Sequence, residues 1–305
     1  MDAASRRGVY GSPAEVWRFD GTEAVQLSPL VPGADALEAL AAGSLTELVM
    51  LAPPGTTERR YALALGLGAL APDAPFTILA PKDKGGSRLA DELGAFGCTF
   101  EQAGKRHHRI CMGRRPTRPQ GLDAAVAGGA PRLVESLGLW SQPGVFSWDR
   151  LDPGSALLIE TLPPLSGKGA DFGCGIGVLA HAALASPKVK ALTLIDIDRR
   201  AVEAARRNLD DPRAEVRWAD LRAGTDGLAS LDFVVTNPPF HQGGLEDQGL
   251  GQGFVATAAK ALRRGGVLWL TANRHLPYEA VLKPLFARVE TRAEGRGFKV
   301  IAAHK

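Results

Sequence analysis

The sequence is short of cysteine, of long apolar runs and of net charge, and each shortage excludes a class of protein. Its three cysteines, Cys98, Cys111 and Cys174, are too few for a disulfide framework and too scattered for a zinc-ligand pattern. We therefore expect no metal site and a reducing, cytoplasmic setting. No apolar run approaches the length of a membrane span, and the N-terminal residues contain no apolar signal segment, so we expect no membrane contact. The net charge of +3 permits an anionic partner without demonstrating one.

Length and composition describe an ordinary globular protein with more than one domain. The chain has 305 residues, of which 45% are hydrophobic and 23% are charged, and no internal repeat is visible. A stretch rich in Pro, Gly and Ala over Pro116–Pro131 is typical of a linker. We therefore predict two domains, residues 1–120 and 121–305, in a monomer.

The first half alternates short apolar strands with helices. Strands are predicted at Glu47–Ala52, Phe76–Ala80 and Arg109–Met112, and the chain before Gly33 is polar and rich in turns. The predicted helices are Ala34–Ala42, Glu58–Leu70 and Ser87–Phe96. This order indicates an α/β layer with a parallel sheet. No glycine-rich turn of the kind found later at Ala170–Leu179 (ADFGCGIGVL) follows any of these strands, so this half is interpreted as a scaffold or a substrate-recognition surface.

A basic segment, Lys105–Arg118 (KRHHRICMGRRPTR), lies near the end of this half. It contains six formally positive residues and no acid, which suits contact with RNA. A solvated loop that balances acidic residues elsewhere explains the same charges. His107 and His108 have no partners at metal-ligand spacing and are interpreted as surface residues.

The second half predicts a doubly wound, mostly parallel sheet that ends in a hairpin. The hairpin signal is Glu294–Gly297 (EGRG), between the last two strands. The seven predicted strands are Gly169–Phe172, Ala191–Asp196, Glu215–Trp218, Leu231–Thr236, Val267–Thr271, Arg288–Ala293 and Phe298–Ala303. Before them, Asp152 or Ser155 can cap a helix that extends to Leu162. The fold class is therefore α/β, Rossmann-like and seven-stranded.

Polar and glycine residues follow the predicted strands where such sheets bind ligands. The loop in Ala170–Leu179 (ADFGCGIGVL) contains Asp171, Gly173, Cys174 and Gly175. On its own a glycine-rich turn can serve only a tight turn and close helix packing.

Two acids after later strands strengthen the interpretation of a cofactor site. Asp196 can accept both ribose hydroxyls of a nucleoside, and Asp220 can accept an adenine amino group. Asp198 competes for the ribose, although its position better suits a cap on the next helix.

The acid at the start of the loop distinguishes between two cofactors. A dinucleotide fingerprint has its third glycine later in the turn, whereas here Asp171 begins the turn and the third glycine comes early. A carboxylate repels a pyrophosphate and attracts a cation. S-adenosylmethionine contains a sulfonium and an ammonium and no phosphate. We therefore predict that the cofactor is S-adenosylmethionine.

The turn Asn237-Pro238-Pro239-Phe240 predicts the acceptor. An exocyclic amine on a base is a poor nucleophile because its lone pair is delocalised into the ring. The amide oxygen of Asn237 and the carbonyl of Pro238 can accept its two N–H bonds and so orient the lone pair. Pro239 stiffens the turn, and Phe240 can stack on the base. After transfer the acidic nitrogen loses its proton to water, so no strong base is required.

Two further residues are candidates for substrate contact. His241 can contact the substrate or make a hydrogen bond within its own loop. Lys299, beside Phe298 in the last strand, can face the substrate or lie on the surface with its ammonium in water. The sequence does not choose between these alternatives.

Taken together, the loop and the turn resemble the class I S-adenosylmethionine-dependent methyltransferases that modify amino groups. GVFSWDRLDPGSALL, NPPFHQG, ANRHLPYEAVL and GRGFKV resemble, more narrowly, the bacterial guanine-N2 enzymes of the ribosomal RNA small subunit methyltransferase C type. The similarity covers nearly all of the second domain, and PKDKGG at Pro81–Gly86 matches the first domain more loosely. The resemblance implies a degenerate methyltransferase-like first domain, a catalytic second domain, and a guanine of small-subunit (16S) ribosomal RNA as substrate.

Other functions share parts of these motifs. Enzymes that methylate adenine N6 or a protein glutamine amide use the same Asn-Pro-Pro-aromatic turn. A cofactor-binding ribosome assembly factor without catalysis would keep the glycine loop, and an NAD-dependent oxidoreductase is a more distant alternative.

Overall fold

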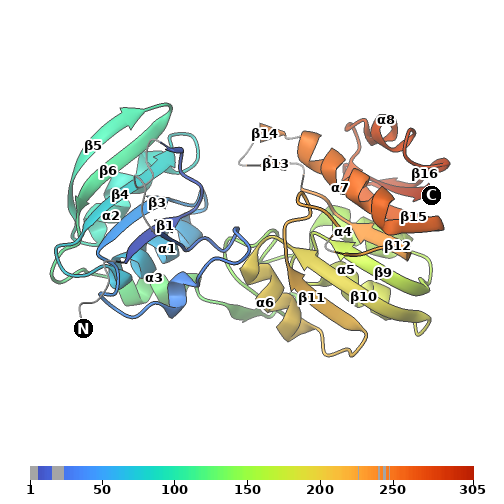
Figure 1. The fold of residues 1–305 in the computed structure, drawn as a ribbon, viewed down its shortest axis with the longest axis horizontal. Helices are drawn as coiled ribbons and strands as arrows, with labels where there is room; N and C mark the ends of the chain where they lie inside the picture. The colour runs from blue at the N-terminus through green and yellow to red at the C-terminus, as the bar shows by residue number, and fades with distance from the viewer. Residues whose placement is uncertain (1–5, 16–23, 226, 240, 243–244, 247) are drawn as a thin grey trace. The chain divides into compact units, whose positions relative to one another are not determined.

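The computed structural model describes residues 6–15, 24–225, 227–239, 241–242, 245–246 and 248–305 (Figure 1). The chain forms two compact units, Met1–Pro131 (unit 1) and Arg132–Lys305 (unit 2). Within the described ranges, no helix is long and apolar enough to cross a membrane.

Unit 1 is built on a six-stranded sheet with the order β2-β1-β3-β4-β6-β5. Its strands are β1 (Arg7–Tyr10), β2 (Ala24–Gln26), β3 (Glu47–Leu51), β4 (Pro75–Pro81), β5 (Thr99–Lys105) and β6 (His108–Arg114). The first four are parallel, and β5 and β6 form an antiparallel hairpin against β4. The predicted strands at β3 and β4 are confirmed. The prediction of an irregular chain before Gly33 is wrong at β1 and β2, which are too short to show a pattern and gain their order from pairing.

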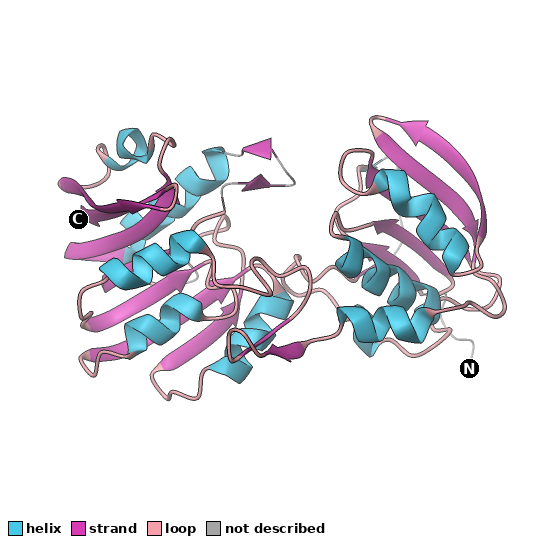
Figure 2. Ribbon diagram, turned by 180° about the vertical axis from the view of Figure 1, so that it is seen from behind, coloured by secondary structure: helices cyan, strands magenta, loops and turns pink. Residues whose placement is uncertain are grey.

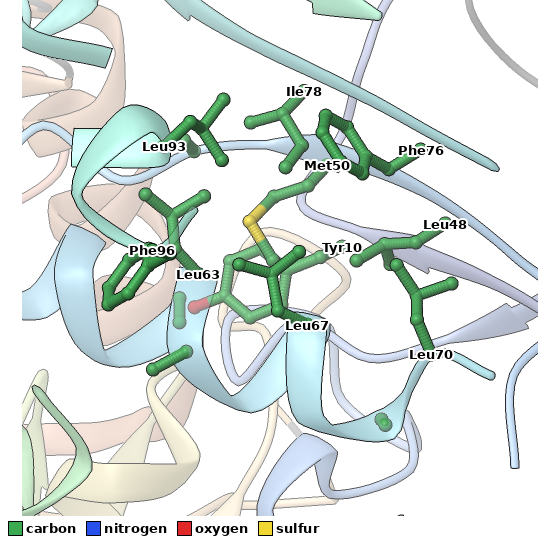
Figure 3. Packing of buried hydrophobic residues seen from close by; sticks show 14 of the residues in the cluster. Tyr10, Leu48, Met50, Leu63, Leu67, Leu70, Phe76, Ile78, Leu93 and Phe96 are labelled. Atoms are coloured by element: carbon green, nitrogen blue, oxygen red, sulfur yellow. The ribbon is translucent and has the colours of Figure 1, made fainter. Parts of the chain in front are cut away.

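The helices of unit 1 are α1 (Thr56–Ala69), α2 (Leu89–Ala95) and α3 (Leu122–Gly129), with 3-10 turns η2 (Leu37–Ala39) and η3 (Gly86–Arg88). Figure 3 shows Leu63 and Leu67 of α1 packed around Met50 of β3. The predicted helix Ala34–Ala42 shrinks to η2, which has no side-chain cap.

The predicted linker Pro116–Pro131 instead contains a helix, α3, that packs on α1. A Cβ on Gly129 of α3 would meet Cβ of Tyr61 at 2.3 Å, so only a glycine allows this close approach. The compact units consequently divide after Pro131, eleven residues beyond the boundary that we predicted after residue 120.

Unit 2 contains the seven-stranded sheet, with the order β11-β10-β9-β12-β15-β17-β16. Its strands are β9 (Gly167–Phe172), β10 (Val189–Asp196), β11 (Ala214–Trp218), β12 (Leu231–Thr236), β15 (Leu262–Asn273), β16 (Arg288–Gly295) and β17 (Phe298–His304). β17 runs opposite to the other six strands, and it forms the predicted hairpin with β16. Two small antiparallel pairs are β7 (Arg132–Val134) with β8 (Leu139–Ser141), and β13 (His241–Gln242) with β14 (Leu245–Glu246). The doubly wound sheet is confirmed.

Helices cover both faces of this sheet (Figure 2). They are α4 (Pro153–Thr161), α5 (Val178–Leu184), α6 (Arg199–Asn208), α7 (Gln248–Ala261) and α8 (Tyr278–Leu282). Successive side chains of a strand point to opposite faces. Phe233 and Val235 of β12 accordingly pack with α4 and α5, whereas Val234 packs with α7 and α8. Asp171, between Ala170 and Phe172 of β9, therefore faces α4 and α5.

The strand order reverses between β9 and β12, which is where ligands bind in such sheets. The chain leaves β9 through α5 towards β10 and returns to the other side of β9 as β12. At this edge the Thr236 hydroxyl donates a hydrogen bond to the Phe172 carbonyl at 2.7 Å. The bond joins the last residues of β9 and β12. The glycine loop and Asn237, which follow these two residues, therefore start from adjacent points of the sheet.

Candidate active site

The glycine loop leaves β9 in a conformation that only glycine adopts easily. Gly173, Gly175 and Gly177 have φ angles of 70°, 54° and 92°. The backbone N–H groups of Gly173 and Cys174 donate to the Ile195 carbonyl of β10 at 2.8 and 3.1 Å. The loop is thus held against the end of β10.

Of the glycines in this loop, Gly175 faces open space. A Cβ there would meet no atom of the described residues within 4 Å, whereas a Cβ on Gly177 would meet Leu209 Cδ1 at 3.2 Å. Gly177 therefore serves the packing of the loop on the chain after α6. Gly175 leaves a space in which a cofactor can approach the backbone.

Gly175→Ala is expected to weaken S-adenosylmethionine binding by about tenfold or more, because the new methyl group enters this space. The left-handed backbone adds a cost of about 1 kcal/mol to folding. Gly138→Ala is the matched control, since Gly138 also has a left-handed φ (64°) and open surroundings. Calorimetry should give an unchanged Kd for the control, and an unchanged Kd for Gly175→Ala would contradict the placement of the cofactor.

Asp196 ends β10 and braces the loop. Its Oδ2 accepts the Gly175 N–H at 2.8 Å, and its Oδ1 accepts the Asp198 N–H at 2.8 Å. Burial, with a contribution from the Asp198 charge, raises the pKa of Asp196 to about 6, although these backbone donors act in the opposite direction. Each oxygen keeps a lone pair for a ribose hydroxyl. The ribose role of Asp196 stays a prediction.

Asp198 makes the helix cap that we predicted as its better role. Its side chain accepts the Arg200 N–H at 3.0 Å at the start of α6. The same carboxylate pairs with the Arg200 guanidinium at 2.8 Å. Asp198 is therefore committed to α6.

Asp171 is completely buried, and within the described residues neither carboxylate oxygen has a hydrogen-bond partner. Burial first, and then the charge of Asp196, raises the pKa of Asp171 to about 8, while the nearby Ala180 N–H of α5 lowers it. An ionised carboxylate here lacks compensation, and a bound cation would supply it. The site thus fits a cofactor with a positive charge.

Two other predicted cofactor residues have local partners. Asp220 is held by Arg222, whose Nη2 lies 2.7 Å from Oδ2, and this hydrogen bond lowers the pKa of Asp220. An adenine amino group would have to share this carboxylate with Arg222. The buried Cys174 thiol contacts the Gly175 carbonyl at 3.6 Å, and burial raises its pKa. Cys174 therefore contributes packing rather than a reactive thiolate.

Asn237 follows β12 and is oriented by the first turn of α4. Its Nδ2 donates to Asp152 Oδ2 at 2.8 Å and to Ser155 Oγ at 2.9 Å. A carboxylate only accepts hydrogen bonds, so the amide nitrogen must face Asp152. The amide oxygen is then the atom that can accept an N–H from a substrate. In the sequence, Asp152 and Ser155 were identified only as helix caps, and this contact was missed.

The remaining residues of the predicted acceptor turn are partly described. Pro238 is buried and Pro239 is exposed. Phe240 and the side chain of His241 lie outside the described residues, so their predicted roles stay predictions.

Lys299 is buried, so the alternative of a surface lysine is wrong. Its Nζ pairs with Glu279 Oε1 and Oε2 at 2.7 and 2.8 Å, and its side chain is 7% exposed. A substrate contact would require this ion pair to open.

The basic segment Lys105–Arg118 contains the turn between β5 and β6, the strand β6 and the four residues that follow it. The predicted strand Arg109–Met112 is confirmed within β6, and the alternative of a solvated loop fits only the turn and the last four residues. The turn residues Arg106 and His107 have φ angles of 48° and 62°. Arg114 donates to the Asp73 carbonyl at 2.6 Å. The segment is thus ordered, and part of its charge has acidic or carbonyl partners within unit 1.

A second asparagine, Asn208 at the end of α6, also supports the loop and was missed in the sequence. Its Nδ2 donates to the carbonyls of Trp140 and Ile176, both at 2.9 Å, and its Oδ1 accepts the Trp140 N–H at 2.7 Å. Asn208 thereby connects β8 to the glycine loop. An asparagine at a helix end gives no specific signal in a single sequence.

Comparisons with known proteins identify the family of the chain. Residues 136–302 match the family model of the methyltransferase small domain. A ribosomal RNA small subunit methyltransferase C from Pseudomonas aeruginosa (strain LESB58) is 34% identical over 300 residues, which are 96% of this chain and 89% of the relative. The protein of the same name from Shewanella amazonensis (strain ATCC BAA-1098 / SB2B) is 33% identical, over 85% of this chain and 77% of the relative.

Among solved structures, the T. thermophilus 16S rRNA N2 methyltransferase in complex with AdoMet and guanosine has the same fold. It aligns with a TM-score of 0.82 at 24% identity and covers 99% of this chain and 88% of that chain. The match includes the unit that precedes the methyltransferase domain. With the sequence identity over nearly its whole length, the chain belongs to the ribosomal RNA small subunit methyltransferase C family.

Proposed function

We propose that this chain transfers a methyl group from S-adenosylmethionine to the N2 amine of a guanine in small-subunit (16S) ribosomal RNA. The observation that carries the proposal is Asn237, whose amide nitrogen is held by α4 so that its oxygen can accept from an amine. Asn237 follows directly after Thr236, which is hydrogen-bonded to the residue before the glycine loop, at the point where the strand order reverses. An amine acceptor and a cationic cofactor therefore meet at one edge of the sheet.

The cofactor supplies an electrophilic methyl group on a sulfonium. The chain would hold it through the loop at Gly173 and Gly175, through Asp196 at the ribose and through the buried Asp171 near its positive charge. Asp220 would reach the adenine amino group.

On the acceptor side, the Asn237 amide oxygen and the Pro238 carbonyl would accept the two N–H bonds of the guanine amine. This fixes the nitrogen and directs its lone pair towards the methyl group. Phe240 would stack on the base, with Pro239 and His241 beside the substrate. Positioning then provides most of the catalysis, because the methylated nitrogen is acidic enough to lose its proton to water.

The choice of guanine and of ribosomal RNA rests on the relatives. The curated proteins that match nearly the whole chain are named as ribosomal RNA methyltransferases, and the structural relative methylates guanine 1207 of 16S rRNA. We propose the equivalent guanine as the target, and the cytoplasm, where ribosomes assemble, as the location.

We propose that unit 1 is a degenerate copy of the catalytic fold that serves as a scaffold or in RNA recognition. Its strands β3-β4-β6-β5 run in the same relative directions as β12-β15-β17-β16 of unit 2. After β3 comes Ala52-Pro53-Pro54, where Asn237-Pro238-Pro239 follows β12. Ala52 has no side-chain amide that could accept an N–H bond from a substrate amine.

The proline carbonyls of unit 1 are also occupied. Arg59, which is completely buried, donates its Nη1 to the carbonyls of Pro53 and Pro54 at 3.2 and 2.8 Å. Its guanidinium also pairs with Glu92 at 2.6 Å. An internal arginine thus takes the hydrogen bonds that a substrate amine would make, which supports a single active site in unit 2.

The test is methyl incorporation with the purified chain. Tritiated S-adenosylmethionine should label 16S rRNA or small subunits, and digestion should release N2-methylguanosine. Label in N6-methyladenosine or in protein would replace the proposal with one of the two related amine acceptors. Cofactor binding without transfer to any of these substrates would favour an assembly factor.

A further inference from the structure

We propose that Asp152 and Ser155 are positioning residues that select which end of the Asn237 amide faces the substrate. The inference rests on the proposed function and adds two residues that do not touch the reacting atoms. They lie at the N-cap and in the first turn of α4, on the face of the sheet that Asp171 shares.

The two contacts use both hydrogens of the amide nitrogen. Asp152 Oδ2 lies 2.8 Å and Ser155 Oγ 2.9 Å from Asn237 Nδ2. If the amide rotated by half a turn, its oxygen would face the Asp152 carboxylate, and two acceptors cannot form a hydrogen bond. The rotated amide would also donate an N–H towards the amine lone pair that must attack the methyl group. Asp152 therefore excludes the unproductive orientation.

The first turn of α4 is held in place by its own cap and by packing on β17, which keeps Asp152 and Ser155 at a constant distance from Asn237. Asp152 Oδ2 also accepts the Ser155 N–H at 2.8 Å as the helix cap. A Cβ on Gly154 would approach Phe298 Cδ1 of β17 to 2.8 Å and Asp152 Oδ2 to 3.0 Å. The glycine thus allows α4 to lie against β17, which fixes the position of Asp152 relative to the sheet.

The variant Asp152→Ser keeps the helix cap of α4 and removes the hydrogen bond to Asn237, so the two roles of Asp152 can be measured separately. Serine caps helices about as well as aspartate, but its shorter side chain does not reach Asn237. We expect kcat to fall by roughly tenfold or more, the size of one lost charge-assisted hydrogen bond. KM for S-adenosylmethionine and the melting temperature should change little. Glu160→Gln, on the exposed end of the same helix, is the matched control and should leave kcat unchanged.

A polarity exchange tests the donor–acceptor relation itself. Asn237→Asp alone brings two carboxylates to hydrogen-bonding distance, so kcat should fall and gain a dependence on pH because the pair must share a proton. The double variant Asp152→Asn/Asn237→Asp restores one donor and one acceptor, and it keeps an acceptor towards the substrate. The amide nitrogen of its new side chain, in the place of Asp152 Oδ2, no longer accepts the Ser155 N–H, so the melting temperature should fall by the loss of one helix cap while kcat is compared. We expect the double variant to recover about tenfold in kcat over Asn237→Asp and to lose the added pH dependence.

The inference is overturned if Asp152→Ser retains the wild-type kcat, or if the double variant is no more active than Asn237→Asp. Failure of the proposed function is a separate result, because it concerns which amine the wild-type chain methylates. If that amine is not guanine N2, the same kcat comparisons on the amine that is methylated still decide the role of Asp152.

Discussion

Asn237→Ala is expected to abolish measurable methyl transfer while S-adenosylmethionine binding stays within a few-fold of wild type. Removal of one preorganised hydrogen bond to reacting atoms costs about 10²–10³ in kcat, and here the amine also loses its orientation. The side chain is half-buried, and its nitrogen is held by Asp152 and Ser155 of α4, so the fold should tolerate its loss. Single-turnover assays with saturating cofactor measure the effect.

Calorimetric titration with S-adenosylmethionine provides the control for Asn237→Ala. A Kd close to wild type shows that the glycine loop and Asp196 are intact. Turnover at the wild-type rate would exclude Asn237 as the acceptor of the amine, and a complete loss of cofactor binding would make it a structural residue instead.

Asp171→Asn is expected to stabilise the free protein and to weaken its binding of S-adenosylmethionine. The folded protein holds Asp171 with a pKa of about 8, against about 3.9 in an unfolded chain. Because the folded state binds the extra proton, this group's contribution to stability is complete below about pH 4 and is lost as the pH rises to about 8. An asparagine avoids the buried charge but cannot neutralise a cationic ligand. Residues of a binding site commonly show this opposition between stability and function.

The pH dependence of both quantities checks the role of Asp171. The melting temperature of free wild type should fall relative to Asp171→Asn between about pH 5 and pH 8, since Asn does not titrate. A cation favours the ionised carboxylate, so the wild-type affinity for S-adenosylmethionine should rise over the same range and then level off. A variant that melts lower than wild type at pH 8 and binds S-adenosylmethionine equally well would contradict this account.

Strand alternation made the fold of unit 2 predictable. Each strand is followed by a clear helix, turn or hairpin signal, and Glu294–Gly297 marks the last reversal. The errors in unit 1 have a different cause. The four residues of β1 and the three of β2 show no periodicity of their own and become strands only by pairing beside β3. The helix α3 is built from Ala and Gly, whose composition is also that of a linker, and close packing against Tyr61 decides between the two.

The candidate site was predictable where function depends on strand ends. Asp171, Asp196 and Asn237 each lie at or directly after a strand in the sequence and in the structure. The hydrogen-bond partners of Asn237 could not be predicted from the sequence, because Asp152 lies 85 residues before it and a helix cap gives no sign of a second hydrogen bond. The alternative of a surface position for Lys299 was wrong for the same reason, since its partner Glu279 is twenty residues away on another element.

The central claim is that this chain methylates guanine N2 in small-subunit ribosomal RNA through Asn237. Its most direct test is a map of N2-methylguanine in ribosomal RNA from cells without the protein, and from the same cells given back wild type or Asn237→Ala. We expect one modified guanine to be absent in the deletion strain, restored by wild type and still absent with Asn237→Ala. An unchanged map in the deletion strain, or restoration by Asn237→Ala, would contradict the claim.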